Sequence, residues 1–144
     1  MVRYEHTQRG TVLLVTFLVT VFFLLALDML VPAVRGVLVI VIGILTVCGF
    51  FFSSLTVRIT DRGLQWRFGP GLIRKEVPLK EIQRVEVTDT TFLQGWGIHY
   101  TSRGWLYNVS GFRAVAVTLK SGKQFLLGTD EPEQLRAAIH HALS

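Results

Sequence analysis

Residues 92–112 hold the side chains best suited to recognising another molecule. This segment contains two of the three tryptophans, two of the three tyrosines and four glycines. Trp and Tyr combine apolar area with a polar group, which favours them at protein contacts and at membrane interfaces. The pattern predicts a partner-binding surface made by Trp96, His99, Tyr100, Arg103 and Tyr107. The alternative is structural, with Trp105 and Tyr107 filling a β core while the glycines bend strands.

A second candidate site consists of basic residues that follow the second apolar run of the chain. These residues are Arg58, Arg62, Arg67, Arg74 and Lys75. Basic side chains next to a membrane attract anionic lipid by about 1 kcal/mol each. The sequence therefore predicts, as an alternative to the partner-binding surface, a site for lipid head groups. Because Asp61 and Glu76 intervene, a solvated face that only sets membrane orientation is the other interpretation.

Catalytic and metal-binding patterns are weak in this chain. Asp89, His99 and Tyr100 have the types of an acid–base set, but their spacing does not require one. The adjacent His140 and His141 would point about 100° apart on a helix, unlike the i,i+4 pairs that share a metal. No serine lies in a nucleophile-elbow context. We expect no catalytic residue, no metal site and no cofactor.

The composition separates a membrane part from a water-facing part. The chain has 144 residues, of which 17% are charged, against about 25% in ordinary soluble domains. Its net charge is +5, but basic residues alternate with acidic ones, so we expect no nucleic-acid partner. Cys48 is the single cysteine, which excludes an internal disulfide.

Two uncharged apolar runs, residues 11–27 and 36–52, predict a transmembrane hairpin. Each run gives roughly 26 Å of helix, and uncharged flanks extend both toward the thickness of a bilayer. We expect spans at about residues 10–28 and 34–54, joined by a tight connector with Pro32. A cleaved signal peptide is less favoured, because an Ala-x-Ala site is missing and a second run follows. Residues 1–54 then form an N-terminal tail and the hairpin.

The distribution of basic residues predicts the orientation of this hairpin. They flank its outer ends as Arg3, Arg9, Arg58, Arg62 and Arg67, whereas the connector carries only Arg35. The positive-inside rule places both termini, and the domain that follows, in the cytoplasm. Gly36 and Gly43 are seven residues apart on one helix face, which indicates close contact with the first helix or oligomerisation.

Residues 55–144 read as a mainly β domain that ends in one helix. Hydrophobic residues alternate from Leu55 onward, and turn signals separate about seven short strands, typical of a bent sheet or partial barrel. The strands are expected near residues 55–60, 64–68, 72–77, 82–87, 105–109, 112–119 and 124–127. An amphipathic helix follows at about residues 131–143. Asp130 with Glu133 resembles a capping box, which predicts Asp130 as the N-cap.

The order of elements and several local patterns point to a family. The patterns are residues 55–64, 77–82 and 128–133, with further likeness in 96–100 and 104–111. The chain resembles the small membrane-anchored bacterial pleckstrin-homology-like proteins, which contain a bacterial PH domain. This resemblance implies the fold more strongly than the function, since some eukaryotic relatives bind phosphoinositides and others bind peptides or proteins.

These observations predict a non-catalytic, membrane-anchored interaction or scaffolding module. Its expected partners are the lipid bilayer and a protein partner or further copies of itself, so that it self-assembles or serves a membrane complex as an accessory subunit. Recognition of anionic lipid head groups at the cytoplasmic leaflet is the alternative. A membrane enzyme is the third and least favoured function.

Overall fold

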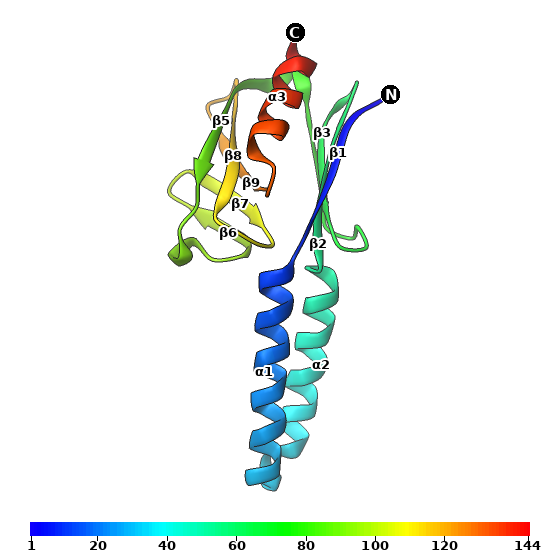
Figure 1. Ribbon diagram of the computed structural model, residues 1–144, viewed down its shortest axis with the longest axis vertical. Helices are drawn as coiled ribbons and strands as arrows, with labels where there is room; N and C mark the ends of the chain where they lie inside the picture. The colour runs from blue at the N-terminus through cyan, green and yellow to red at the C-terminus, as the bar shows by residue number, and fades with distance from the viewer.

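The computed structural model describes residues 1–144 and consists of a long helical hairpin joined to a β domain (Figure 1). The hairpin consists of α1 (Thr11–Leu30), a short 3-10 turn η1 (Pro32–Val34) and α2 (Arg35–Phe51). Both helical segments are long and apolar enough to cross a membrane. The helical hairpin of this prediction is confirmed, and η1 with Pro32 at its start makes the tight connector.

The glycines of α2 have different environments. A side chain at Gly49 would meet the ring of Phe17 at 2.9 Å, so this glycine lets α1 and α2 approach closely. A side chain at Gly36 or Gly43 would have no neighbour within 4 Å. The close helix approach expected at Gly36 and Gly43 is therefore made at Gly49 instead.

Nine strands form two sheets in the β domain. Sheet A has the order β1-β2-β3-β4, with β1 (Val2–Arg9), β2 (Ser54–Thr60), β3 (Gly63–Phe68) and β4 (Arg74–Pro78). Sheet B has the order β5-β8-β9-β7-β6, with β5 (Ile82–Asp89), β6 (Gly97–Thr101), β7 (Gly104–Asn108), β8 (Arg113–Leu119) and β9 (Gln124–Gly128). All neighbours are antiparallel except β7 and β9, which pair in parallel.

The prediction of about seven strands is too low, because sequence analysis misses β1 and β6. In β1 the residues that face the core are Tyr4, His6 and Gln8, so the alternation of apolar and polar residues is weak. In β6 the single apolar residue with a partner in the main core is Ile98, and the residues beside it are Gly97 and His99. Both strands lie at sheet edges, where a strong apolar pattern is not needed.

The helical hairpin is inserted between two strands that pair with each other. β1 leads into α1, α2 leads back into β2, and the register joins Arg9 to Ser54. The Gly10 amide donates to the Ser53 carbonyl at 2.8 Å, so the chain leaves and re-enters the sheet at adjacent points. Residues 2–9, expected to form a tail, are thus the first strand of the β domain.

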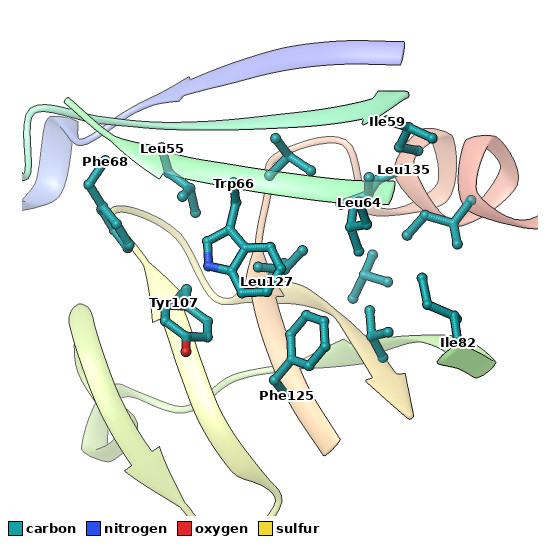
Figure 2. Packing of buried hydrophobic residues seen from close by; sticks show 14 of the residues in the cluster. Leu55, Ile59, Leu64, Trp66, Phe68, Ile82, Tyr107, Phe125, Leu127 and Leu135 are labelled. Atoms are coloured by element: carbon teal, nitrogen blue, oxygen red, sulfur yellow. The ribbon is translucent and has the colours of Figure 1, made fainter. Parts of the chain in front are cut away.

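The main core lies between the two sheets (Figure 2). Trp66 of β3 stacks on Phe125 of β9 at 4.8 Å between ring centroids and lies 5.2 Å from Tyr107 of β7. α3 (Pro132–Leu143) adds Leu135 and Ile139, which are fully buried in the same core. Each such side chain stabilises the fold by about 1.5–3 kcal/mol, so α3 is an integral part of the domain.

The start of α3 differs from the predicted capping box. The N-cap is Glu131, and no side chain caps the helix. Asp130 Oδ1 instead lies 2.6 Å from His6 Nε2, and Glu131 Oε2 lies 3.3 Å from His6 Nδ1. The expectation of an Asp130 cap is wrong, because β1 brings a competing partner from the other end of the chain.

We expect Asp130→Ala to act through His6 rather than through the helix end. Asp130 is mostly exposed, so its pair with His6 contributes below about 1 kcal/mol. Thermal unfolding of the full chain in detergent tests this with a double-mutant cycle. His6→Ala combined with Asp130→Ala is expected to lower the midpoint no further than the larger single change. Additive losses would show that Asp130 stabilises the helix independently of His6.

Candidate functional site

The predicted partner-binding residues do not form one surface. Tyr107 is buried in the core, with Trp66 against its ring and the Lys75 ammonium 5.5 Å from its centroid. Trp96 lies in the loop before β6, half-buried, and its indole N–H donates to the Gly111 carbonyl at 3.1 Å. Tyr107 is therefore not accessible to a partner, and Trp96 holds a loop together.

The other members of this group lie on or beside the edge strand β6. His99 contacts the Trp96 carbonyl through Nε2. Tyr100 is 74% exposed and packs edge-on against Trp105, with 5.4 Å between ring centroids. Sequence reasoning favoured Trp96 over Trp105 as a contact residue, yet Trp105 is 46% exposed. Sequence analysis treats the residues around Tyr100 as a loop. Because it misses the strand β6, it could not place Tyr100 beside Trp105.

Arg103 closes sheet B upon itself. Its Nη1 donates to Thr88 Oγ1 at 2.6 Å, although Arg103 follows β6 and Thr88 belongs to β5, the opposite edge strand. The two edges of the sheet therefore approach each other. This curling is consistent with burial of a second, smaller apolar cluster, Leu106, Ala114, Ala116 and Leu126. Arg103 is thus engaged within the domain.

Three of the basic residues, Arg58, Arg67 and Arg74, by contrast lie on the outer face of sheet A, opposite the main core. Lys75 pairs with Trp66 and reaches toward the core side of the sheet. A hollow of about 550 Å³ lies along sheet A, lined by Thr56, Arg58, Gln65, Trp66, Arg67, Arg74, Lys75 and Glu76. Four of the five basic residues singled out from the sequence line this hollow. Arg62 does not, because it lies in the turn between β2 and β3.

The strand register explains which charges meet in this hollow. Arg67 of β3 lies directly opposite Arg74 of β4, and Thr56 of β2 continues the same row. Neither arginine forms an ion pair with a carboxylate. Like charges directly opposite in a sheet are destabilising, and an anion between them would offset that cost. The pair has the chemistry of an anion site.

The remaining cations of the hollow have partners. Arg58 donates twice to Glu5 of β1, with distances of 2.9 and 3.1 Å. Lys75 places its ammonium over the Tyr107 ring. Glu76 is the single carboxylate among the lining residues. The free positive charge of the hollow therefore comes from Arg67 and Arg74.

This hollow lies at the end of the β domain from which the helices extend. A side chain at Gly69, in the turn between β3 and β4, would meet the Phe51 carbonyl of α2 at 2.6 Å. Arg67 precedes Gly69 by two residues, and Figure 1 shows this turn just above the upper end of α2. Arg9, the last residue of β1, faces outward by strand alternation and also lies at this end.

Arg9 is a residue that the sequence reasoning used only for membrane orientation. It is exposed and has no ion-pair partner within the chain. Its position two residues before α1 could have indicated that it lies near the membrane surface. Its strand could not be read from the sequence, so its face of the sheet was unknown.

Comparison of the chain with protein-family models, with curated proteins and with solved structures gives no match. The fold and the hollow define a class by geometry alone: an apolar helical hairpin inserted into a two-sheet β domain with an unpaired arginine pair near the helix ends. The function is argued from that geometry below.

Proposed function

We propose that this protein is a non-catalytic, membrane-anchored module that binds anionic lipid head groups through Arg67 and Arg74. The observation that carries the proposal is the position of this unpaired arginine pair, in a hollow beside the end of α2. A membrane that surrounds the helices would place its head groups at this level. Arginine suits phosphate because its planar guanidinium donates two parallel hydrogen bonds.

The charges at the two ends of the hairpin support the proposed orientation. At the connector, Arg35 is paired with Asp28 at 3.0 Å. At the domain end, Arg9, Arg67 and Arg74 remain unpaired. The positive-inside rule then favours the β domain on the cytoplasmic side of a bacterial plasma membrane. Both termini lie with the β domain, away from the connector (Figure 1), so both would be cytoplasmic.

A pleckstrin-homology-like fold is part of this proposal. Two β sheets enclose one core, and α3 covers it with Leu135 and Ile139. This arrangement supports the resemblance drawn from the sequence patterns. The strand β1 and the parallel pair of β7 and β9 were not expected from that resemblance.

A non-catalytic role fits the residues of the hollow. Its lining has one carboxylate, Glu76, and no histidine, cysteine or serine to serve as base or nucleophile. A binding role requires only the two arginines and hydrogen-bonding neighbours such as Thr56 and Gln65. We propose no cofactor.

Contact with a protein partner or a second copy is the other candidate function. The observation that favours it is the exposed pair of Tyr100 and Trp105 beside the edge strand β6. Edge strands offer unpaired backbone groups, and exposed aromatic side chains are frequent at the energetic centre of interfaces. We rank it second because the predicted contact residues do not converge.

The double variant Arg67→Gln with Arg74→Gln tests the lipid proposal. Each basic residue near a membrane contributes about 1 kcal/mol, so the preference for anionic over zwitterionic lipid should fall roughly 30-fold. Native mass spectrometry of the full chain, released from mixed phosphatidylglycerol and phosphatidylcholine micelles, counts the retained lipids. Raising the salt concentration should weaken retention by the unchanged protein.

The matched control is Lys120→Gln with Lys123→Gln. These lysines are exposed around the turn between β8 and β9, and their replacement changes the net charge equally. The control is expected to keep the lipid preference. Equal retention by both double variants would show that the hollow is not the lipid site.

A further inference from the structure

A second group of exposed side chains lies at the helix end of the β domain, and it is apolar. Phe92 and Leu93 belong to the 3-10 turn η3 (Phe92–Gln94) and are 71% and 95% exposed. Phe112, in the turn before β8, is 49% exposed. Contiguous exposed groups of large apolar residues commonly mark sites that contact a membrane or a partner.

This apolar group is held in place by its neighbours. Trp96 packs edge-on against Phe92 at 5.7 Å and lies 5.8 Å from Phe112, measured between ring centroids. The Thr91 amide donates to Gln94 Oε1 at 2.9 Å, which closes a capping box around η3. The exposed rings are therefore presented by an ordered turn, so little conformational entropy is lost when they are buried.

Hydrogen bonds connect this turn to the point where the helices begin. Gln8 Nε2 donates to the Ser110 carbonyl at 3.0 Å, and α1 begins three residues after Gln8. The Trp96 indole donates to the neighbouring Gly111 carbonyl. Figure 1 shows the turn after β5 near the level of the upper end of α1, on the opposite side of the hairpin from the turn between β3 and β4.

The sequence of the turn matches an apolar environment. Residues 90–98 contain no charged side chain, and neither do residues 109–112. Trp96 carries a polar N–H on an apolar ring, a type that prefers the boundary between lipid and water. On the other side of the hairpin, the turn between β3 and β4 also exposes Leu72 near the end of α2.

We infer that Phe92, Leu93 and Phe112 insert into the membrane interface and attach the β domain to the bilayer beside its helices. This inference rests on the proposed membrane anchoring, because the direction of α1 and α2 defines where the bilayer lies. The inserted turn would stop the β domain from tilting about the hairpin. It would thereby hold the hollow of sheet A close to the head groups.

Site-directed spin labelling of the full chain in nanodiscs tests this inference. Cys48 is replaced by Ala, and a nitroxide is placed at one of three positions: Leu18→Cys in α1, Leu93→Cys in η3 and Ser121→Cys in the turn after β8. All three residues are exposed, so labelling leaves the packing intact. Oxygen concentrates in lipid, whereas a nickel chelate stays in water, and power saturation compares the access of each to the label.

The expected result is that the Leu93 label, like the Leu18 label, is relaxed more strongly by oxygen than by the nickel chelate. The Ser121 label should show the reverse. A Leu93 label as accessible to nickel as the Ser121 label, with Leu18 in lipid, would overturn the inference and leave the proposed anchor intact. A Leu18 label in water would overturn the anchor itself. Shielding of Leu93 from both reagents would identify a protein contact instead of lipid, which also overturns the inference.

Discussion

Replacing residues 11–51 with Asn-Gly is expected to yield a folded, water-soluble β domain. The Gly10 amide already donates to the Ser53 carbonyl, so the two ends that must be joined lie side by side. Asn-Gly is a preferred sequence for short turns between antiparallel strands. The hairpin-deleted chain keeps β1 paired with β2, and with it every strand of sheet A.

A chain that starts at Ser53 is expected to fail where the hairpin-deleted chain succeeds. It lacks β1, which pairs with β2 along its length and packs Tyr4 against the core. Tyr4 is partly buried, and burial together with the nearby Glu131 and Asp130 raises its pKa to about 12. Losing a whole strand should remove most of the roughly 5–15 kcal/mol that stabilises a domain.

Circular dichroism and thermal melting of the two shortened chains provide the measurement. The hairpin-deleted chain should unfold cooperatively, and the chain from Ser53 should show no cooperative transition. Adding a synthetic peptide of residues 1–10 should restore structure to the latter, because it supplies the missing strand. Equal melting temperatures for both chains would show that β1 is dispensable.

The second large effect, a loss of folding stability, is expected from Gly104→Ala. Gly104 has φ +100°, and a Cβ there would lie 1.9 Å from the Gln124 carbonyl oxygen. This oxygen belongs to the backbone of β9 and cannot move without separating β7 from β9. We expect a loss of more than about 3 kcal/mol, since backbone strain and disrupted strand pairing add.

Gly122→Ala is the matched control for that substitution. Gly122 also has a positive φ, +85°, but nothing lies within 4 Å of an added Cβ. Its cost should be about 1 kcal/mol, from the backbone conformation alone. Denaturant unfolding of the full chain in detergent, followed by tryptophan fluorescence, compares the two. Equal losses would contradict the close approach of β7 to β9.

The parts of the fold with one strongly apolar environment were predictable from the sequence. The uncharged runs around α1 and α2 predicted the helical hairpin, and the alternation of Leu55, Val57 and Ile59 predicted a strand with one buried face. Leu135 and Ile139 likewise predicted the buried face of α3. Where one face of an element is buried, apolar residues recur at a regular spacing. Where the whole surface of a helix is apolar, they form an uninterrupted run.

Most basic residues of the candidate site were singled out from the sequence, but the opposed arginine pair was not predictable, because it depends on which residues the strand register brings together. Arg67 and Arg74 are opposed only because a turn of fixed length joins β3 to β4. Arg62 is closer to Arg67 in sequence than Arg74 is, yet it lies in a turn outside the hollow. Tyr107, in the segment richest in aromatics, points into the core instead.

The order of β1, hairpin and β2 has a consequence for how the chain is made. β1 leaves the ribosome before the helices and stays without its partner until β2 has been synthesised. If the helices cross a membrane, β1 and β2 meet only when both have crossed, since a single crossing would leave the two strands on opposite sides. The open edges of an incorrectly inserted chain would be exposed to proteases and chaperones. Completion of sheet A would thus distinguish a chain with both helices inserted from a chain with only one helix inserted.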